Sequence, residues 1–99
     1  MRLTKKEQDA IKTNFKKIFN EGCIYLFGSR VDDSRKGGDI DLYISTNNKN
    51  NLVENKINFL GALQREIGEQ KIDIVLDYGE ARLIDRKVKK EGIKLCEMN

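Results

Sequence analysis

Residues 26–44, LFGSRVDDSRKGGDIDLYI, restrict the possible folds of this chain more than any other segment. The apolar run at residues 23–27 is bounded by Gly22 and Gly28, which is typical of a central strand buried on both faces. Residues 39–44 then alternate between two faces, which predicts a second strand. The two faces carry Ile40, Leu42 and Ile44 on one side and Asp39, Asp41 and Tyr43 on the other.

A first helix is predicted over residues 4–20. Thr4 and Glu7 have the spacing of a capping box. The apolar residues that follow recur with helical periodicity at Ile11, Phe15, Ile18 and Phe19. This segment should therefore lie with one face against the sheet.

A second helix is predicted after the polar loop at residues 45–51, and it ends at Gly68. Its apolar stripe consists of Val53, Ile57, Leu60, Leu63 and Ile67.

The last third of the chain adds a strand, a short helix and another strand. Residues 71–77 alternate and place Asp73 in mid-strand. A short helix carrying Ala81, Ile84 and Val88 leads to a final strand at residues 93–95. Because strands and helices interleave, the fold class is α/β or α+β, with helices covering a small mixed sheet.

Length and composition limit the functional classes. Ninety-nine residues predict one domain spanning 1–99. The chain shows neither a signal peptide nor a transmembrane stretch, so we expect a cytoplasmic protein without membrane contact. The absence of histidine excludes a Ser-His-Asp triad and a histidine base, and Cys23 and Cys96 are expected to be free thiols in strands. A net charge of +3 with interspersed signs does not indicate direct nucleic-acid binding.

Asp39 and Asp41 are the first candidate site residues, since i and i+2 side chains of a strand share a face. Two adjacent carboxylates repel unless a cation lies between them, and carboxylate oxygens are preferred ligands of Mg²⁺. An isolated D-x-D is more often a solvated edge strand. Asp73 would add a third carboxylate if its strand lies beside the second, which would make a two-metal phosphoryl-transfer site.

The Gly28-Ser29 pair closes the first strand and supplies a candidate phosphate site. Glycine permits close backbone approach, and the following amides and hydroxyl can hold phosphate oxygens. Arg30, Arg35 and Lys36 flank this turn and could neutralise a polyphosphate, although basic loop residues are usually solvated.

Taken together, GSR at residues 28–30, GDIDLYI at 38–44 and KIDIVL at 71–76 resemble the signature of the DNA polymerase beta-type nucleotidyltransferase superfamily. The length and the late VKKEGIKLCE at residues 88–97 are similar to its minimal, stand-alone members, the minimal nucleotidyltransferases. The resemblance implies the polymerase beta-like fold and an enzyme. Gly38 is a departure, since many members have serine before the first aspartate.

Residue by residue, the resemblance implies that Gly28 and Ser29, with Arg30, bind a nucleoside triphosphate, expected to be ATP. Asp39 and Asp41 would hold two Mg²⁺ ions, and Asp73 would be the third ligand and help to deprotonate the acceptor hydroxyl. The attack would release pyrophosphate.

Minimal members commonly resemble antitoxins that transfer AMP to a tyrosine of a HEPN-type RNase toxin, and this is the first functional interpretation. The second is a binding antitoxin that neutralises its partner by contact without catalysis. The third is adenylation of a small hydroxylated compound, although relatives with that activity usually have an additional helical domain.

Overall fold

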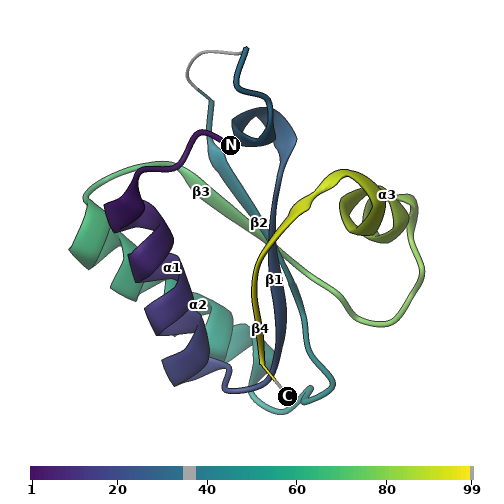
Figure 1. The fold of residues 1–99 in the computed structure, drawn as a ribbon. Helices are drawn as coiled ribbons and strands as arrows, with labels where there is room; N and C mark the ends of the chain where they lie inside the picture. The colour runs from purple at the N-terminus through teal and green to yellow at the C-terminus, as the bar shows by residue number, and fades with distance from the viewer. Residues whose placement is uncertain (35–37, 99) are drawn as a thin grey trace.

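The described residues form a four-stranded mixed sheet with helices on both sides (Figure 1). This arrangement comes from a computed structural model that describes residues 1–34 and 38–98. The elements are, in order, α1 (Lys5–Ile18), β1 (Gly22–Phe27), the short 3₁₀ helix η1 (Gly28–Val31), β2 (Ile40–Ser45), α2 (Leu52–Ile67), β3 (Ile72–Leu76), α3 (Leu83–Glu91) and β4 (Ile93–Met98). The predicted α+β class is confirmed.

The strand order in the sheet is β3-β2-β1-β4. β1 is antiparallel to both β2 and β4, whereas β2 and β3 run parallel. A parallel pair needs a long crossover, and α2 provides it between β2 and β3. Because β1 and β2 are antiparallel neighbours, the turn that follows β1 lies beside the start of β2.

The two faces of the sheet have different roles, and we call them the helix-pair face and the site face. The helix-pair face packs against α1 and α2, while α3 lies on the opposite side, against the site face (Figure 1). The helix-pair face holds most of the hydrophobic core: Ile24, Leu26, Ile40, Leu42, Ile44, Ile72, Ile74 and Leu76. The site face carries Asp41, Tyr43 and Ser45 of β2 and their strand partners.

α1 begins as its capping box predicts. Thr4 Oγ1 accepts the backbone N–H of Glu7 at 3.0 Å, and Glu7 Oε1 accepts the backbone N–H of Thr4 at 2.8 Å. Both bonds satisfy donors that a helix N-terminus otherwise leaves unpaired. Ala10, Ile11 and Phe15 are then buried against the sheet and α2.

The predicted apolar stripe of α2 is partly wrong. Leu63 is buried and Leu60 and Ile67 pack against the core, but Val53 and Ile57 are 58% and 64% exposed. The buried face of α2 consists of Leu52, Phe59, Ala62 and Leu63. On this buried face, Phe59 packs edge-to-face on Phe19, the C-cap residue of α1, with ring centroids 5.7 Å apart.

The burial of the site face differs from the sequence-based expectation in both directions. Tyr43, expected beside Asp39 and Asp41 on a polar face, is fully buried. β1, expected to be buried on both faces, is buried at Ile24 and Leu26 and only half-buried at Tyr25 and Phe27. Both differences arise because α3 covers part of this face and leaves the rest open.

Smaller differences concern the end of the chain. Ala81 lies before α3 with a φ of 51° rather than inside the helix. β4 continues to Met98, beyond the predicted residues 93–95. Cys23 and Cys96 lie in strands as free thiols, as expected, but they are only half-buried. Within the described residues, no helix combines the length and apolarity needed to span a membrane.

Candidate active site

Strand pairing alone brings two of the predicted carboxylates together. Asp41 of β2 is the register partner of Asp73 of β3, and on its other side it pairs with Phe27 of β1. Neighbouring strands lie about 4.8 Å apart. Phe27, Asp41 and Asp73 therefore form one row across the site face, at the end of the sheet where β1 enters its turn.

The third predicted carboxylate, Asp39, lies just before β2. Its side chain is 41% exposed, and its Oδ2 lies 3.4 Å from Nζ of Lys71, which just precedes β3. Lys71 was not singled out by sequence reasoning, because only the parallel pairing of β2 and β3 places it here. Asp39 thus has a cationic neighbour at the edge of the row.

The electrostatics of the row centre on Asp41. Burial raises the pKa of this carboxyl, and the negative charges of Asp73 and Asp39 raise it further, with Lys71 offsetting only part of the effect. Like charges opposite each other on neighbouring strands are unfavourable. An added cation between Asp41 and Asp73 would relieve this repulsion.

The Gly28-Ser29 turn touches these carboxylates directly. Gly28 has a φ of +75°, and a Cβ at this position would lie 2.3 Å from Oδ2 of Asp41. Gly38 has a φ of +91°, and a Cβ there would lie 2.1 Å from Oγ of Ser29. The positive φ favours glycine at both positions, and an added Cβ would also force the carboxylate of Asp41 or the hydroxyl of Ser29 to move. Gly38, where the resemblance leads one to expect serine, therefore has a conformational reason in this chain.

Arg30, predicted to bind the nucleotide, contacts the protein itself. Its Nε donates to the carbonyl of Gly38 at 3.2 Å and its Nη1 to the carbonyl of Arg2 at 2.9 Å, with Oε1 of Glu7 at 3.9 Å from Nη1. Arg2 in turn donates from Nη2 to the carbonyl of Ser29 at 2.9 Å. These contacts tie the N-terminal segment to the turn, and Arg30 acts in them as a brace.

Two further predicted residues, Arg35 and Lys36, lie outside the described residues. Arg2 and Glu7 are the bracing residues that sequence reasoning missed. Glu7 had only a capping signal, and nothing in the sequence connects Arg2 with a turn 27 residues away.

The oxygen donors at this end of the sheet fit a divalent cation that is shared with a nucleotide. Among residues 1–34 and 38–98, no three acidic or cysteine side chains are grouped closely enough to hold a metal ion by themselves. Mg²⁺ is usually held by one or two carboxylates together with substrate phosphates and water. Asp41 beside Asp73, next to a glycine turn, offers that donor set. The predicted participation of Asp39 as a further ligand stays a prediction.

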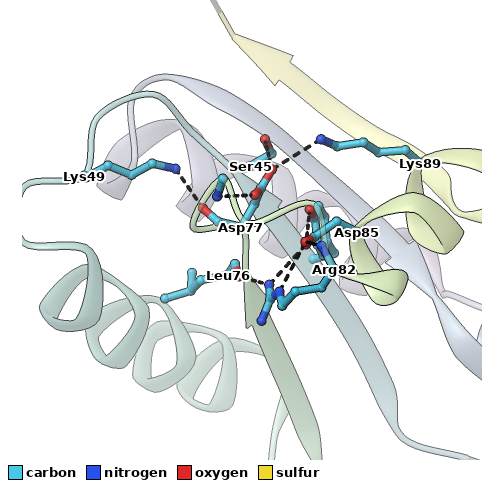
Figure 2. Close-up of polar contacts among 9 residues, drawn as sticks. Ser45, Lys49, Leu76, Asp77, Arg82, Asp85 and Lys89 are labelled. Carbon is cyan, nitrogen blue, oxygen red and sulfur yellow. Dashed lines mark hydrogen bonds and ion pairs between the residues drawn. The ribbon is translucent and has the colours of Figure 1, made fainter.

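A buried polar network fixes α3 on the site face (Figure 2). The hydroxyl of Tyr43 donates to Oδ1 of Asp85 at 2.7 Å, and Arg82 donates to the same carboxylate from its backbone and its guanidinium. Nη2 of Arg82 also donates to the carbonyl of Leu76 at 2.7 Å. The hydrogen bonds from Arg82 and Tyr43 lower the pKa of Asp85 to about 2.

Asp77 extends this network at the far end of the site face. Its Oδ2 accepts from Oγ of Ser45 at 3.0 Å and from Nζ of Lys89 at 3.3 Å (Figure 2). Burial raises the pKa of Asp77, but these bonds and the one from the backbone N–H of Gly79 outweigh it, so the pKa is lowered. In the sequence, Asp77 is only the last residue of the alternating segment 71–77, and nothing there indicates this network.

Comparison with protein families decides the classification. Residues 9–99 match the family model described as "Polymerase beta, Nucleotidyltransferase". The chain belongs to this family. A search of curated proteins found no significant match.

Membership of the polymerase beta nucleotidyltransferase family confirms the superfamily suggested by the sequence motifs and accords with the observed fold. It indicates nucleotidyl transfer as the general activity. The matched region of this nucleotidyltransferase contains the Gly28-Ser29 turn and Asp39, Asp41 and Asp73. Their individual roles stay predictions.

Proposed function

We propose that this nucleotidyltransferase transfers a nucleoside monophosphate to a hydroxyl group in a Mg²⁺-dependent reaction, with AMP from ATP as the expected group. The support is the contact between its two motifs, because Gly28 lies so close to Asp41 that an added Cβ would force the carboxylate to move. A triphosphate held at that turn would have its α-phosphate, the group that is attacked, beside Asp41 and Asp73.

The chain's own residues have separable roles in this proposal. The backbone amides after Gly28 and the hydroxyl of Ser29 hold phosphate oxygens. Asp41 and Asp73, which are strand partners, would hold Mg²⁺ together with the triphosphate, and Asp39 would add a further ligand. When bound, Mg²⁺ supplies Lewis-acid polarisation of the phosphate and neutralises its charge.

The reaction forms a bond between the acceptor oxygen and the α-phosphorus and breaks the bond from that phosphorus to the pyrophosphate oxygen. Asp73, whose side chain is exposed on the site face, accepts the proton of the acceptor hydroxyl. Pyrophosphate is the leaving group, and its oxygen keeps the electron pair of the broken bond. The protein contributes mainly position and electrostatic stabilisation.

We further propose that the acceptor is a tyrosine of a helical HEPN-type partner and that the chain acts as an antitoxin. The support is the resemblance to minimal nucleotidyltransferases and the openness of the site, since Asp39 and Asp73 remain accessible beside a partly covered sheet face. A second protein can reach such a site more easily than an enclosed one.

The test is transfer of label from α-³²P-ATP with Mg²⁺ to a candidate partner, chosen as an all-helical protein encoded next to this chain's gene, followed by gel and mass spectrometry. Wild type and the matched control Asp9→Asn, an exposed position in α1, should label a tyrosine of the partner. Asp41→Asn should not. If Asp41→Asn still folds and neutralises the partner without labelling it, neutralisation occurs by contact and the catalytic antitoxin is rejected.

A further inference from the structure

A pocket of about 370 Å³ lies between η1 and α3, beside the proposed phosphate turn. Its size is within the range of small-molecule sites. Apolar side chains form most of its lining, and two charged side chains from α3 complete it. The lining consists of Phe27, Gly28, Val31, Ile84, Lys87, Val88, Glu91 and Gly92.

One face of α3 forms a wall of this pocket. Ile84, Lys87, Val88 and Glu91 follow i, i+3, i+4 and i+7 spacing, so they lie on the same side of the helix. Val88 is buried, whereas Lys87 and Glu91 are exposed. Within the described residues, neither Lys87 nor Glu91 makes an ion pair or a side-chain hydrogen bond, so one donor and one acceptor remain available to a ligand.

The pocket is continuous with the candidate active site. Gly28 lines the pocket and is also the residue whose Cβ would meet Asp41. Phe27 lines the pocket and is the strand partner of Asp41. A ligand whose phosphates lie at the turn therefore has its non-phosphate end within reach of this pocket.

We propose that the pocket binds the adenine base of the nucleotide substrate; this inference rests on the proposed nucleotidyl-transfer function. A flat aromatic base buries its faces against Phe27, Val31 and Ile84. One edge of adenine presents an amino donor at N6 beside an acceptor at N7. That edge matches a carboxylate acceptor at Glu91 and an ammonium donor at Lys87.

The same contacts discriminate between purines. The corresponding edge of guanine presents two acceptors, O6 and N7, and would place O6 against the carboxylate of Glu91. The chain should therefore bind ATP more tightly than GTP, and this preference should depend on Glu91.

Isothermal titration calorimetry with Mg²⁺ and three probes, ATP, GTP and inorganic tripolyphosphate, tests the inference. Ile84→Trp fills the pocket, and Leu83→Trp places the same side chain at an adjacent position that is 84% exposed. We expect Ile84→Trp to weaken ATP binding at least about tenfold, equivalent to about 1.4 kcal/mol, and to leave tripolyphosphate binding unchanged. Leu83→Trp should behave as wild type for both probes.

Surface variants test the same pocket if Ile84→Trp does not fold. Lys87→Met should weaken ATP binding several-fold while Lys90→Met, also exposed on α3, should not. Glu91→Gln should reduce the preference for ATP over GTP. Unchanged ATP binding in Ile84→Trp, Lys87→Met and Glu91→Gln, with tight tripolyphosphate binding, would overturn the base pocket and leave the proposed function intact. Failure of wild type to bind either ATP or tripolyphosphate would overturn both.

Discussion

Gly28 is the residue at which the phosphate turn and the carboxylates meet, and replacing it should separate them. In Gly28→Ala the new methyl group would displace Asp41, and misplacement of a catalytic group by about 1 Å can cost 100-fold in rate. We therefore expect a loss of about 100-fold or more in nucleotidyl transfer, measured with α-labelled ATP.

Gly79→Ala is the matched control for this substitution. Gly79 has a φ of +80°, close to the +75° of Gly28, but a Cβ there would meet nothing within 4 Å. Both variants should lose about 1–2 kcal/mol in free energy of unfolding, because both place alanine in the left-handed region. Equal loss of activity in the two variants would show that backbone strain, and not contact with Asp41, is responsible.

Asp41 should make the free protein less stable at neutral pH than a neutral residue would. Its pKa is higher in the folded state than its ordinary value of 3.8, because of burial and the charges of Asp73 and Asp39. The folded state therefore binds this proton more tightly, and the free energy of unfolding falls as the pH rises from 3.8 through the raised pKa.

Asp41→Asn removes this penalty. Thermal unfolding without nucleotide or Mg²⁺ should show a higher Tm than wild type at pH 7 and no difference at pH 3. Asp9→Asn, which replaces an exposed carboxylate in α1, should leave Tm unchanged at both values. A lower Tm for Asp41→Asn at pH 7 would mean that its charge stabilises the fold.

Among the elements, α3 depends on Asp85 for its position on the site face. Asp85 joins Tyr43 of β2 to Arg82 at the start of α3. Asp85→Asn should lower the free energy of unfolding at pH 7 by about 1–3 kcal/mol, because it weakens charge-assisted hydrogen bonds of a buried group. Tyr43→Phe should cost less, about 1 kcal/mol, since Asp85 keeps its bonds from Arg82.

The pH dependence of the Asp85 variant provides a second readout. The pKa of Asp85 is lowered from 3.8 to about 2, so its stabilisation is present above 3.8 and is lost as the pH falls through 2. Urea denaturation of wild type and Asp85→Asn should therefore converge as the pH falls from 4 to 2. A constant difference over that range would assign the effect to packing.

The buried face of α2 differs from the face that sequence periodicity predicts. Val53 and Ile57 continue the apolar pattern but are exposed, while Phe59 and Leu52 are buried. Helix periodicity predicted the element and its Gly68 end, but the face that is buried depends on contacts with α1 and the sheet. Those contacts are made by residues far apart in sequence.

Substitutions on the observed buried face of α2 should cost more stability than substitutions at the exposed residues of the predicted stripe. Leu63→Ala should cost about 2–5 kcal/mol, because Leu63 is fully buried. The double variant Val53→Ala/Ile57→Ala should change the free energy of unfolding by less than about 1 kcal/mol, since both side chains are largely exposed. Chemical denaturation measures both free energies of unfolding. A large loss in the double variant would contradict the exposure of Val53 and Ile57.

For the whole molecule, local patterns predicted the order of helices and strands and the motif residues of the candidate site. The convergence of Asp41 with Asp73 was only conditional, because it required β2 and β3 to be neighbours, and their parallel pairing now provides this. The Arg2 brace, the Lys71 contact with Asp39 and the buried Tyr43–Asp85 bond had no local signal. Each joins segments that are distant in sequence.

The Gly28-Ser29 turn and the carboxylates of Asp39 and Asp41 should form one nucleotide and metal site. The most direct measurement is the Kd of ATP with and without Mg²⁺ for wild type and for Asp39→Asn/Asp41→Asn, with Asp9→Asn as the control. Mg²⁺ should tighten ATP binding about tenfold or more in wild type and in the control, and should have little effect in the double variant. An equal effect of Mg²⁺ in a folded double variant would show that these carboxylates do not form a metal site with the nucleotide.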